Sequence, residues 1–269
     1  ALGRDDPDAA AVVLAALRAE GIDIREGAPV QRIALGGAGS VAHLEGGAVV
    51  EGSHLLVAAG RKVALDDLGL NAAGVAHSPR GVAVDSALRS TTNRRVYAVG
   101  DAAGGLQFTH VAGAHAGVVI RQILFGLPAR AATTVPWVTY TDPELAQIGL
   151  TEADARAQYG TALSVHRADF AHNDRAVATG KTKGFLKLMV VKSRPVGVTI
   201  VGDGAGEMIG LWSLAMQARL KLSAISATIL PYPTLSEASK RAAGAYFSPK
   251  LFESAMVKRV VGLVQRFVP

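Results

Sequence analysis

The hydrophobic positions of the chain begin with a helical period and then change to short runs separated by turns. Residues 9–20 form an Ala- and Leu-rich segment that Asp6-Pro7-Asp8 introduces and Gly21 ends, which predicts a helix. Short apolar runs follow between Gly-rich turns and predict small strands, the last three of them antiparallel. These runs are residues 22–24, 30–35, 40–44 and 48–51.

The next apolar stretch, residues 53–61, is continuous and ends in Gly60 and Arg61. Such a run predicts a strand that is buried on both faces. A helical turn at 65–70 and a short strand at 82–85 follow. Residues 96–99 then form a short apolar strand that ends in Gly100-Asp101, and a helix continues to residue 124, where Gly126 and Pro128 close it.

The pattern changes at residues 131–134, which we interpret as a domain boundary. Beyond it, strands are predicted at 136–140, 163–170, 184–191 and 195–201, the last two as a hairpin. Helices are predicted at 151–159, 207–220, 224–229 and 235–245. In the second of these helices, the spacing of the apolar positions predicts a core-facing side made of Met208, Leu211, Leu214 and Ala215.

The final segment, residues 249–267, is amphipathic. Its apolar positions recur at Phe252, Met256, Val260, Leu263 and Phe267, and its other face is basic. We expect this helix to dock on the protein itself. Attachment to a membrane surface is the alternative.

Composition narrows the choice of function. The 269 residues are enough for about two domains, and 49% hydrophobic residues can form a core. No run reaches the roughly 18 to 20 uncharged apolar residues of a spanning helix. The net charge is +6, but the basic residues are scattered and only 5% of residues are aromatic, so nucleic-acid binding is not expected.

The chain has no cysteine, which excludes disulfides, thiolate metal sites and a thiol nucleophile within it. The histidines show no shared metal-ligand spacing, so no metal site is predicted. The absence of cysteine favours the cytoplasm. The first eight residues are charged and turn-like, which argues against a signal peptide. Because the chain starts with Ala1 rather than Met, we expect a fragment or a processed product.

The stretch around Gly100-Asp101 is the strongest candidate for a ligand site. Open α/β sheets bind cofactors at the carboxyl ends of their strands, where Asp101 is predicted to lie. The N–H groups at the start of the following helix suit a partly anionic group. The alternative is that Asp101 is an N-cap of that helix. A second Gly-rich loop, residues 202–207, does not fit a phosphate-binding motif and is interpreted as a tight strand-to-helix turn.

Four motifs in order carry a family resemblance: residues 58–61, 99–101, 141–144 with Ile148-Gly149, and 231–237. With them the chain resembles the class I pyridine nucleotide-disulfide oxidoreductases, which are flavoproteins, and most of all their mercuric reductase and dihydrolipoamide dehydrogenase branch. The resemblance covers nearly the whole chain, to about Phe252.

The resemblance implies a C-terminal half of an FAD- and NAD(P)H-dependent enzyme of redox homeostasis. The fold class would be α/β plus α+β, an incomplete nucleotide-binding portion followed by an antiparallel interface domain. Residues 1–62 would end the NAD(P) domain and 63–130 the FAD domain. Residues 131–247 would form the homodimer interface, and 248–269 the C-terminal helix. The missing N-terminal half would hold the glycine fingerprints and a Cys pair.

The resemblance also assigns cofactor contacts. Gly100 and Asp101 would meet the FAD ribityl chain, where a carboxylate accepts hydrogen bonds from hydroxyls. Phe108, Thr109 and His110 would approach the flavin pyrimidine edge at a helix start, although an ordinary helix start explains them too. Gly60 and Arg61 would lie near the nicotinamide, or would simply form a tight turn.

Tyr232 and Glu237 take the place of an acid/base pair. Most disulfide reductases of the family carry His where Tyr232 stands, with Glu five residues later, and mercuric reductases carry Tyr. A phenol with a pKa near 10 donates or orients rather than shuttling protons at neutral pH. Mercury handling is doubtful because the chain ends without a Cys pair. The alternatives are that Tyr232 is an interface residue between two prolines and Glu237 an ordinary Glu of the first helical turn, and that the chain is a non-catalytic dimerisation module.

Overall fold

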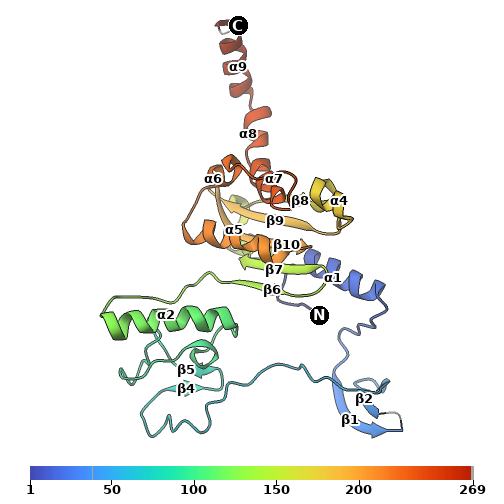
Figure 1. Cartoon of the computed structure of the whole chain (residues 1–269), viewed down its shortest axis with the longest axis vertical. Coiled ribbons are helices and arrows are strands. Elements are labelled where there is room, and N and C mark those ends of the chain that lie inside the picture. Colours follow the sequence, from blue (N-terminus) through green and yellow to red (C-terminus); the bar gives the residue numbers. More distant parts are fainter. Residues whose placement is uncertain (38, 268–269) are drawn as a thin grey trace. The chain divides into compact units, whose positions relative to one another are not determined.

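The structure is a computed structural model that describes residues 1–37 and 39–267 (Figure 1). It divides into two compact units. The first, here called the sheet unit, joins residues 1–24 to the chain from residue 134 onward. The second, called the α2 unit, comprises residues 25–133. Each unit has apolar core residues of its own.

A five-stranded antiparallel sheet forms the centre of the sheet unit, in the order β6-β7-β10-β9-β8. The central strands β9 and β10 are buried along almost their whole length. This confirms the strands and the hairpin predicted from the apolar runs. The five strands are β6 (Pro136–Thr139), β7 (Glu144–Gly149), β8 (Ser164–Asp169), β9 (Phe185–Val191) and β10 (Arg194–Gly202).

Helices α5 (Ala205–Gln217) and α7 (Glu237–Ala245) pack on the sheet, and α6 (Leu222–Ala227) packs on α7. The indole Nε1 of the fully buried Trp212 donates to Ser239 Oγ at 3.0 Å and so links α5 to α7. The helix predicted at 207–220 is confirmed, but Leu214 is 63% exposed. Met208 and Ala215 are buried as predicted, and Ala205, Ile209 and Trp212 complete the buried side of α5.

Helix α1 (Pro7–Ala19) packs on the other face of the same sheet (Figure 1). Alternate side chains of a strand point to opposite faces. Leu145 and Val201 therefore meet Val13 of α1, whereas their neighbours Ala146 and Ile200 join the core under α5. The helix predicted at residues 9–20 is confirmed.

Two short helices connect these elements, and two 3-10 turns lie beside them. Thr151 Oγ1 accepts from the N–H of Asp154 and caps α3 (Glu152–Tyr159), as its position before an acidic first turn predicts. Asn173 caps α4 (Asp174–Thr179) in the same way. The 3-10 turns are η2 (Gly160–Ala162) and η3 (Phe170–His172).

The α2 unit begins with the three predicted small strands, paired antiparallel in the order β1-β2-β3. It continues with a short hairpin, the 3-10 turn η1 (Gly100–Ala103) and helix α2 (Thr109–Phe125), which Gly126 ends in a left-handed conformation. The strands are β1 (Val30–Gly36), β2 (Gly39–Leu44), β3 (Val49–Gly52), β4 (His77–Ser78) and β5 (Gly81–Val82).

Three predicted strands do not form. Residues 22–24 and 54–58 have no regular structure, and within 96–99 only Tyr97 makes an isolated bridge, to Arg89. Far from being buried on both faces, Leu56 is 89% and Val57 73% exposed. A strand needs a neighbour for its backbone N–H and C=O groups, and residues 1–37 and 39–267 supply no ladder along these runs. Likewise, residues 65–70 form turns rather than helix, and the strand at 82–85 shrinks to β5.

The C-terminal segment forms two helices instead of one. Helix α8 (Ser248–Phe252) ends before Glu253, and α9 (Ala255–Phe267) follows. None of the residues of α9 is buried, so the expectation that it docks on this protein is wrong within a single chain. In Figure 1, α9 leads away from the layers of the sheet unit. In the part of the chain described, no helix is both long and apolar enough to cross a membrane.

Candidate functional site

Asp101 lies in a turn whose backbone only glycine permits. Val99 is extended, and Gly100 then takes φ +58° in the left-handed region. A Cβ atom built on Gly100 would lie 2.8 Å from Cβ of Ala112, so a larger residue would push η1 away from α2. The Gly-Asp pair therefore sets how closely this turn approaches the helix.

His115 holds the same turn from the side of α2. The backbone N–H of Gly100 donates to Nδ1 of His115 at 3.2 Å. His115 is buried, and burial lowers the pKa of its imidazole. An unprotonated Nδ1 is the form that can accept this hydrogen bond. The sequence offered no sign of this contact, because nothing local marks a histidine in the second turn of an Ala/Gly-rich helix.

The carboxylate of Asp101 does not cap helix α2. The N-cap position of α2 belongs to Phe108, whose side chain cannot accept a hydrogen bond. The alternative interpretation of Asp101 as N-cap of that helix is therefore wrong. Within the described residues, the Asp101 carboxylate makes no hydrogen bond or ion pair, and its residue is half-buried. The group is thus held in place by its backbone while its oxygens stay uncommitted.

The start of α2 is not capped by a side chain, and two rings flank it. The rings of Phe108 and His110 are stacked, with centroids 5.2 Å apart and planes 10° apart. Thr109 between them is the first residue of the helix. The positive end of the helix dipole is therefore available at this turn.

Gly60 and Arg61 are not brought to this turn by any hydrogen bond that the described residues make. Both are exposed and lie in an irregular segment, and Gly60 has φ +113°. This φ fits the interpretation that Gly60 serves a backbone bend.

Tyr232 has a partner that the sequence did not indicate. Its Oη donates to Oδ2 of Asp174, the first residue of α4, at 2.5 Å. This hydrogen bond, followed by the negative charges of Asp174 and Glu237, raises the pKa of the exposed Tyr232 phenol above its ordinary value of 10.0. Glu237 therefore influences Tyr232 through its charge, but the acceptor of the hydrogen bond from the phenol is Asp174 and not Glu237.

The turn before α4 is tied to the loop that carries Tyr232. The side-chain amide of Asn173 donates to the carbonyl of Thr234 at 3.0 Å, while its Oδ1 caps α4. Arg241 of α7 donates to the carbonyl of His172. The turn that positions Asp174 for its hydrogen bond with Tyr232 is therefore attached both to α7 and to the loop that carries Tyr232. No local pattern marks Asp174, because it lies 58 residues from Tyr232.

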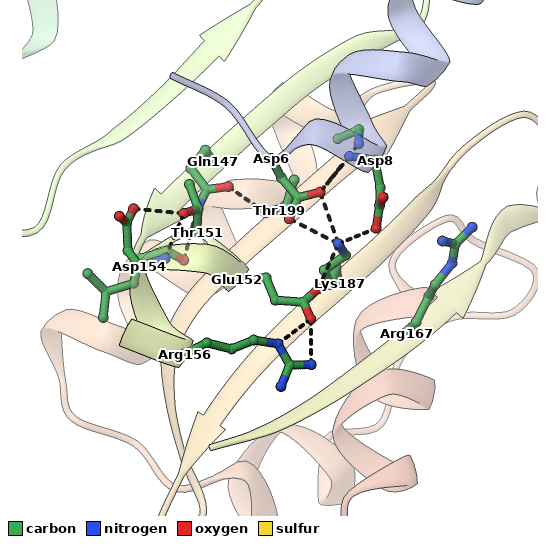
Figure 2. Close-up of polar contacts among 12 residues, drawn as sticks. Asp6, Asp8, Gln147, Thr151, Glu152, Asp154, Arg156, Arg167, Lys187 and Thr199 are labelled. Carbon is green, nitrogen blue, oxygen red and sulfur yellow. Dashed lines mark hydrogen bonds and ion pairs between the residues drawn. The ribbon is translucent and has the colours of Figure 1, made fainter. Parts of the chain in front are cut away.

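A buried lysine of the sheet unit is surrounded by several carboxylates (Figure 2). Lys187 of β9 has a side chain only 4% exposed, and its Nζ contacts Asp6 Oδ1 at 2.9 Å, Asp8 Oδ2 at 2.6 Å and Glu152 Oε2 at 2.9 Å. Burial opposes its charge, but these carboxylates outweigh that effect and raise its pKa. Asp6 is also the N-cap of α1. The cluster therefore attaches α1 to the sheet and has the character of a structural lock.

The second Gly-rich loop is not a phosphate site. The N–H of Gly206, at the start of α5, donates to Oε2 of Glu144 at 2.8 Å. A carboxylate of the protein itself already occupies this helix start, which fits the expected tight turn. A nearby pocket of about 360 Å³ is lined in part by Lys181, whose Nζ pairs with Asp203 at 2.7 Å. Among the described residues, no three His, Asp or Glu side chains are placed so that they could hold a metal ion.

Comparison with known proteins defines the class. A family model described as pyridine nucleotide-disulphide oxidoreductase matches residues 2–116. The model of that family's dimerisation domain matches residues 135–243, which include the whole five-stranded sheet. The chain belongs to the pyridine nucleotide-disulphide oxidoreductase family, a family of flavoproteins, and contains its dimerisation domain.

Within that family, the chain is similar to mercuric reductases. It is 33% identical to the mercuric reductase of Bacillus cereus over 88% of this chain and 38% of that protein. It is 34% identical to dihydrolipoyl dehydrogenase of Staphylococcus aureus over 72% of this chain and 42% of that protein. The chain spans about half the length, or less, of the curated relatives it matches.

A solved structure supports the same assignment. The HOCl-induced flavoprotein disulfide reductase RclA from Escherichia coli matches with a TM-score of 0.82 and 30% identity. The match covers 90% of this chain and 56% of RclA.

Proposed function

We propose that this chain forms the C-terminal portion of an FAD-dependent, NAD(P)H-linked oxidoreductase of the disulfide reductase type. The uncommitted carboxylate of Asp101, held by Gly100 beside the uncapped start of α2, is the observation that carries the proposal. The family membership supports it, as do the printed activities of the relatives, which are mercuric reductase and dihydrolipoyl dehydrogenase.

The residues around η1 fit one half of a flavin site. The Asp101 carboxylate is an acceptor of the kind that the ribityl hydroxyls need. The start of α2, near Phe108, Thr109 and His110, offers a positive helix end to the pyrimidine edge of the ring. FAD, when bound, supplies the transfer of electrons between a nicotinamide and a disulfide or similar acceptor. Gly60 and Arg61 remain proposed neighbours of the nicotinamide.

Tyr232 is proposed to hold its proton rather than to remove one. Since Asp174 and Glu237 raise the pKa of the phenol, Tyr232 stays protonated at neutral pH and donates through Oη. In the assembled enzyme it would orient a group at the redox centre of the partner subunit, with Glu237 beside it. The same proposal includes a cytoplasmic location and the division of the chain into four parts. These are the end of the NAD(P) domain (1–62), the end of the FAD domain (63–130), the dimer interface (131–247) and the C-terminal helix (248–269).

Replacement of Asp101 tests the flavin site. We expect the purified full-length gene product to show visible flavin absorbance, and Asp101→Ala to reduce FAD retention by at least about tenfold, since charge-assisted hydrogen bonds contribute about 1.5 to 3 kcal/mol. Asp67→Ala, which removes an exposed carboxylate of the same unit, is the matched control and should retain FAD. A gene product that purifies without flavin and cannot be reconstituted with FAD would refute the proposal.

One observation favours a second candidate, a non-catalytic dimerisation module. The sheet unit has a complete core around Trp212 that involves no residue of the α2 unit. In that case Asp101→Ala and Asp67→Ala would behave alike, and self-association would be the sole measurable property.

A further inference from the structure

Helix α9 is amphipathic, and none of its residues is buried against the rest of the described chain. At about 100° per residue, its seven apolar side chains fall within an arc of about 160°. They include Leu263, 57% exposed, and Phe267, 78% exposed. The seven are Met256, Val257, Val260, Val261, Leu263, Val264 and Phe267.

The opposite side of α9 is cationic. It carries Lys258, Arg259 and Arg266, and the helix contains no acidic residue. No ion pair joins these three side chains to any residue that the structure describes. The helix therefore presents positive charge and apolar surface together, on opposite sides of one cylinder.

The family relationship does not account for this helix. The two family matches cover residues 2–116 and 135–243, so α8 and α9 lie beyond both. Lys250 of α8 is used differently, since its Nζ lies 3.5 Å from the ring centroid of Tyr246 at the end of α7. This contact holds α8 at the sheet unit, while α9 beyond Glu253 has no comparable attachment among the described residues.

We propose that α9 binds the surface of an anionic lipid bilayer, lying in the headgroup plane with its apolar side among the acyl chains. A short helix with a wide apolar side, Lys and Arg opposite and Leu and Phe among its apolar residues has the composition of interfacial helices. With 13 residues it is about 20 Å long, too short to span the hydrocarbon core.

Charge distinguishes this occupant from a second copy of the chain. A second α9 would cover the apolar side but would leave the three cations on the far side without a counter-charge, whereas a bilayer with anionic headgroups offers both charge of the opposite sign and apolar depth. A purely acidic macromolecule would meet the cations but would leave the seven apolar side chains in water. The proposal stands apart from the flavin site and does not depend on it.

Vesicle flotation of the whole chain tests the proposal. We expect the chain to float with vesicles of equimolar phosphatidylcholine and phosphatidylglycerol, and not with phosphatidylcholine alone. Each cation near an anionic surface strengthens binding about fivefold, so the triple variant Lys258→Gln, Arg259→Gln, Arg266→Gln should bind on the order of a hundredfold more weakly.

Two single variants distinguish insertion of the apolar side into the bilayer from simple charge attraction. Leu263→Glu and Gln265→Glu introduce the same negative charge two residues apart, but on opposite sides of α9. Leu263→Glu should abolish flotation, whereas Gln265→Glu should lower binding by no more than about fivefold. Both should keep the wild-type melting temperature, because α9 contributes no buried residue to the core.

Three results would overturn the proposal. The first is that the wild-type chain does not float with the anionic vesicles. The second is an equal loss for Leu263→Glu and Gln265→Glu, which would indicate charge attraction without insertion. The third is self-association that Leu263→Glu abolishes in the absence of lipid binding, which would assign the apolar side to a second copy of the chain.

Discussion

At the scale of single residues, the turn at Gly100 depends on a ring nitrogen that must stay unprotonated. Nδ1 of His115 accepts the Gly100 N–H, and burial lowers the pKa of the ring. An unpaired buried N–H costs about 1 to 3 kcal/mol. His115 is therefore a positioning residue for Asp101, although the two are far apart in the sequence.

Replacing His115 should loosen this turn. We expect His115→Leu to speed deuterium uptake by residues 96–108 by about 5- to 100-fold, the equivalent of about 1 to 3 kcal/mol. His115→Asn, whose Oδ1 can accept in place of Nδ1, should restore most of the protection. Exposed His54→Leu serves as the control. Uptake that is unchanged in His115→Leu would contradict the assigned role.

The same contact predicts a pH dependence. Because the folded pKa of His115 is lowered, the unfolded state binds the proton more readily than the folded state. The stabilisation is therefore complete above about pH 6.5 and declines as the pH falls below that value. His115→Asn should lack this decline once uptake is corrected for the intrinsic pH effect on exchange.

Sequence reasoning located residues whose role follows from a local pattern. Gly100-Asp101 stands out because a Gly-Asp pair between an apolar run and a helix has a backbone reason. His115 and Asp174 could not be found in this way, because their contacts join positions 15 and 58 residues apart. A hydrogen bond between distant residues leaves no period or motif in the sequence.

At the scale of elements, one lysine attaches α1 to the sheet. Lys187 belongs to β9, yet its carboxylate partners lie at the start of α1 and on α3. A buried pair that loses one partner leaves an uncompensated charge, which costs about 3 to 5 kcal/mol. The fully buried Asp6 would be that charge.

Lys187→Met should therefore destabilise the sheet unit by about 3 to 5 kcal/mol in urea unfolding followed by Trp fluorescence. Trp137 reports on this end of α1, since its Nε1 donates to Asp5. Lys192→Met, at an exposed position outside the cluster, should change stability by no more than about 0.5 kcal/mol. Equal effects of the two variants would show that the cluster does not lock α1.

Acid should weaken the same lock. Lys187 lowers the pKa of Asp8 and of Glu152, so their contribution to stability is present above about pH 4 and is lost as the pH falls through their lowered values. Lys187→Met should flatten this part of the acid unfolding profile.

Elements were predictable where their partners lie within the chain. Four of the five strands of the sheet were predicted from apolar runs, and β9 and β10 pair through a tight turn as the predicted hairpin requires. Strand β7 was not predicted, and its partner β10 lies about 50 residues further along the chain. Residues 22–24 and 53–61 have the composition of strands, but strand formation depends on a neighbour. The amphipathic character of the C-terminal segment was predicted correctly, but the spacing of apolar residues does not indicate what their side of the helix contacts.

At the scale of the whole molecule, the dimerisation domain predicts self-association. We expect sedimentation equilibrium to show a homodimer of the 27.7 kDa chain, formed through residues 131–247. Leu263→Glu should leave this dimer intact, because α9 lies outside the dimerisation domain. A chain that stays monomeric at high concentration would contradict the prediction.

The exposed run at residues 54–59 has a consequence for how the chain behaves in concentrated solution. Its leucines and valine present bare backbone hydrogen-bonding groups together with an uncharged apolar surface. Such a stretch can recruit a like stretch from another molecule into a growing ladder. No Asp, Glu, Lys or Arg lies between Glu51 and Arg61 to oppose such pairing. We therefore expect self-association in concentrated solution to begin at this short run, whose residues contribute to none of the apolar cores.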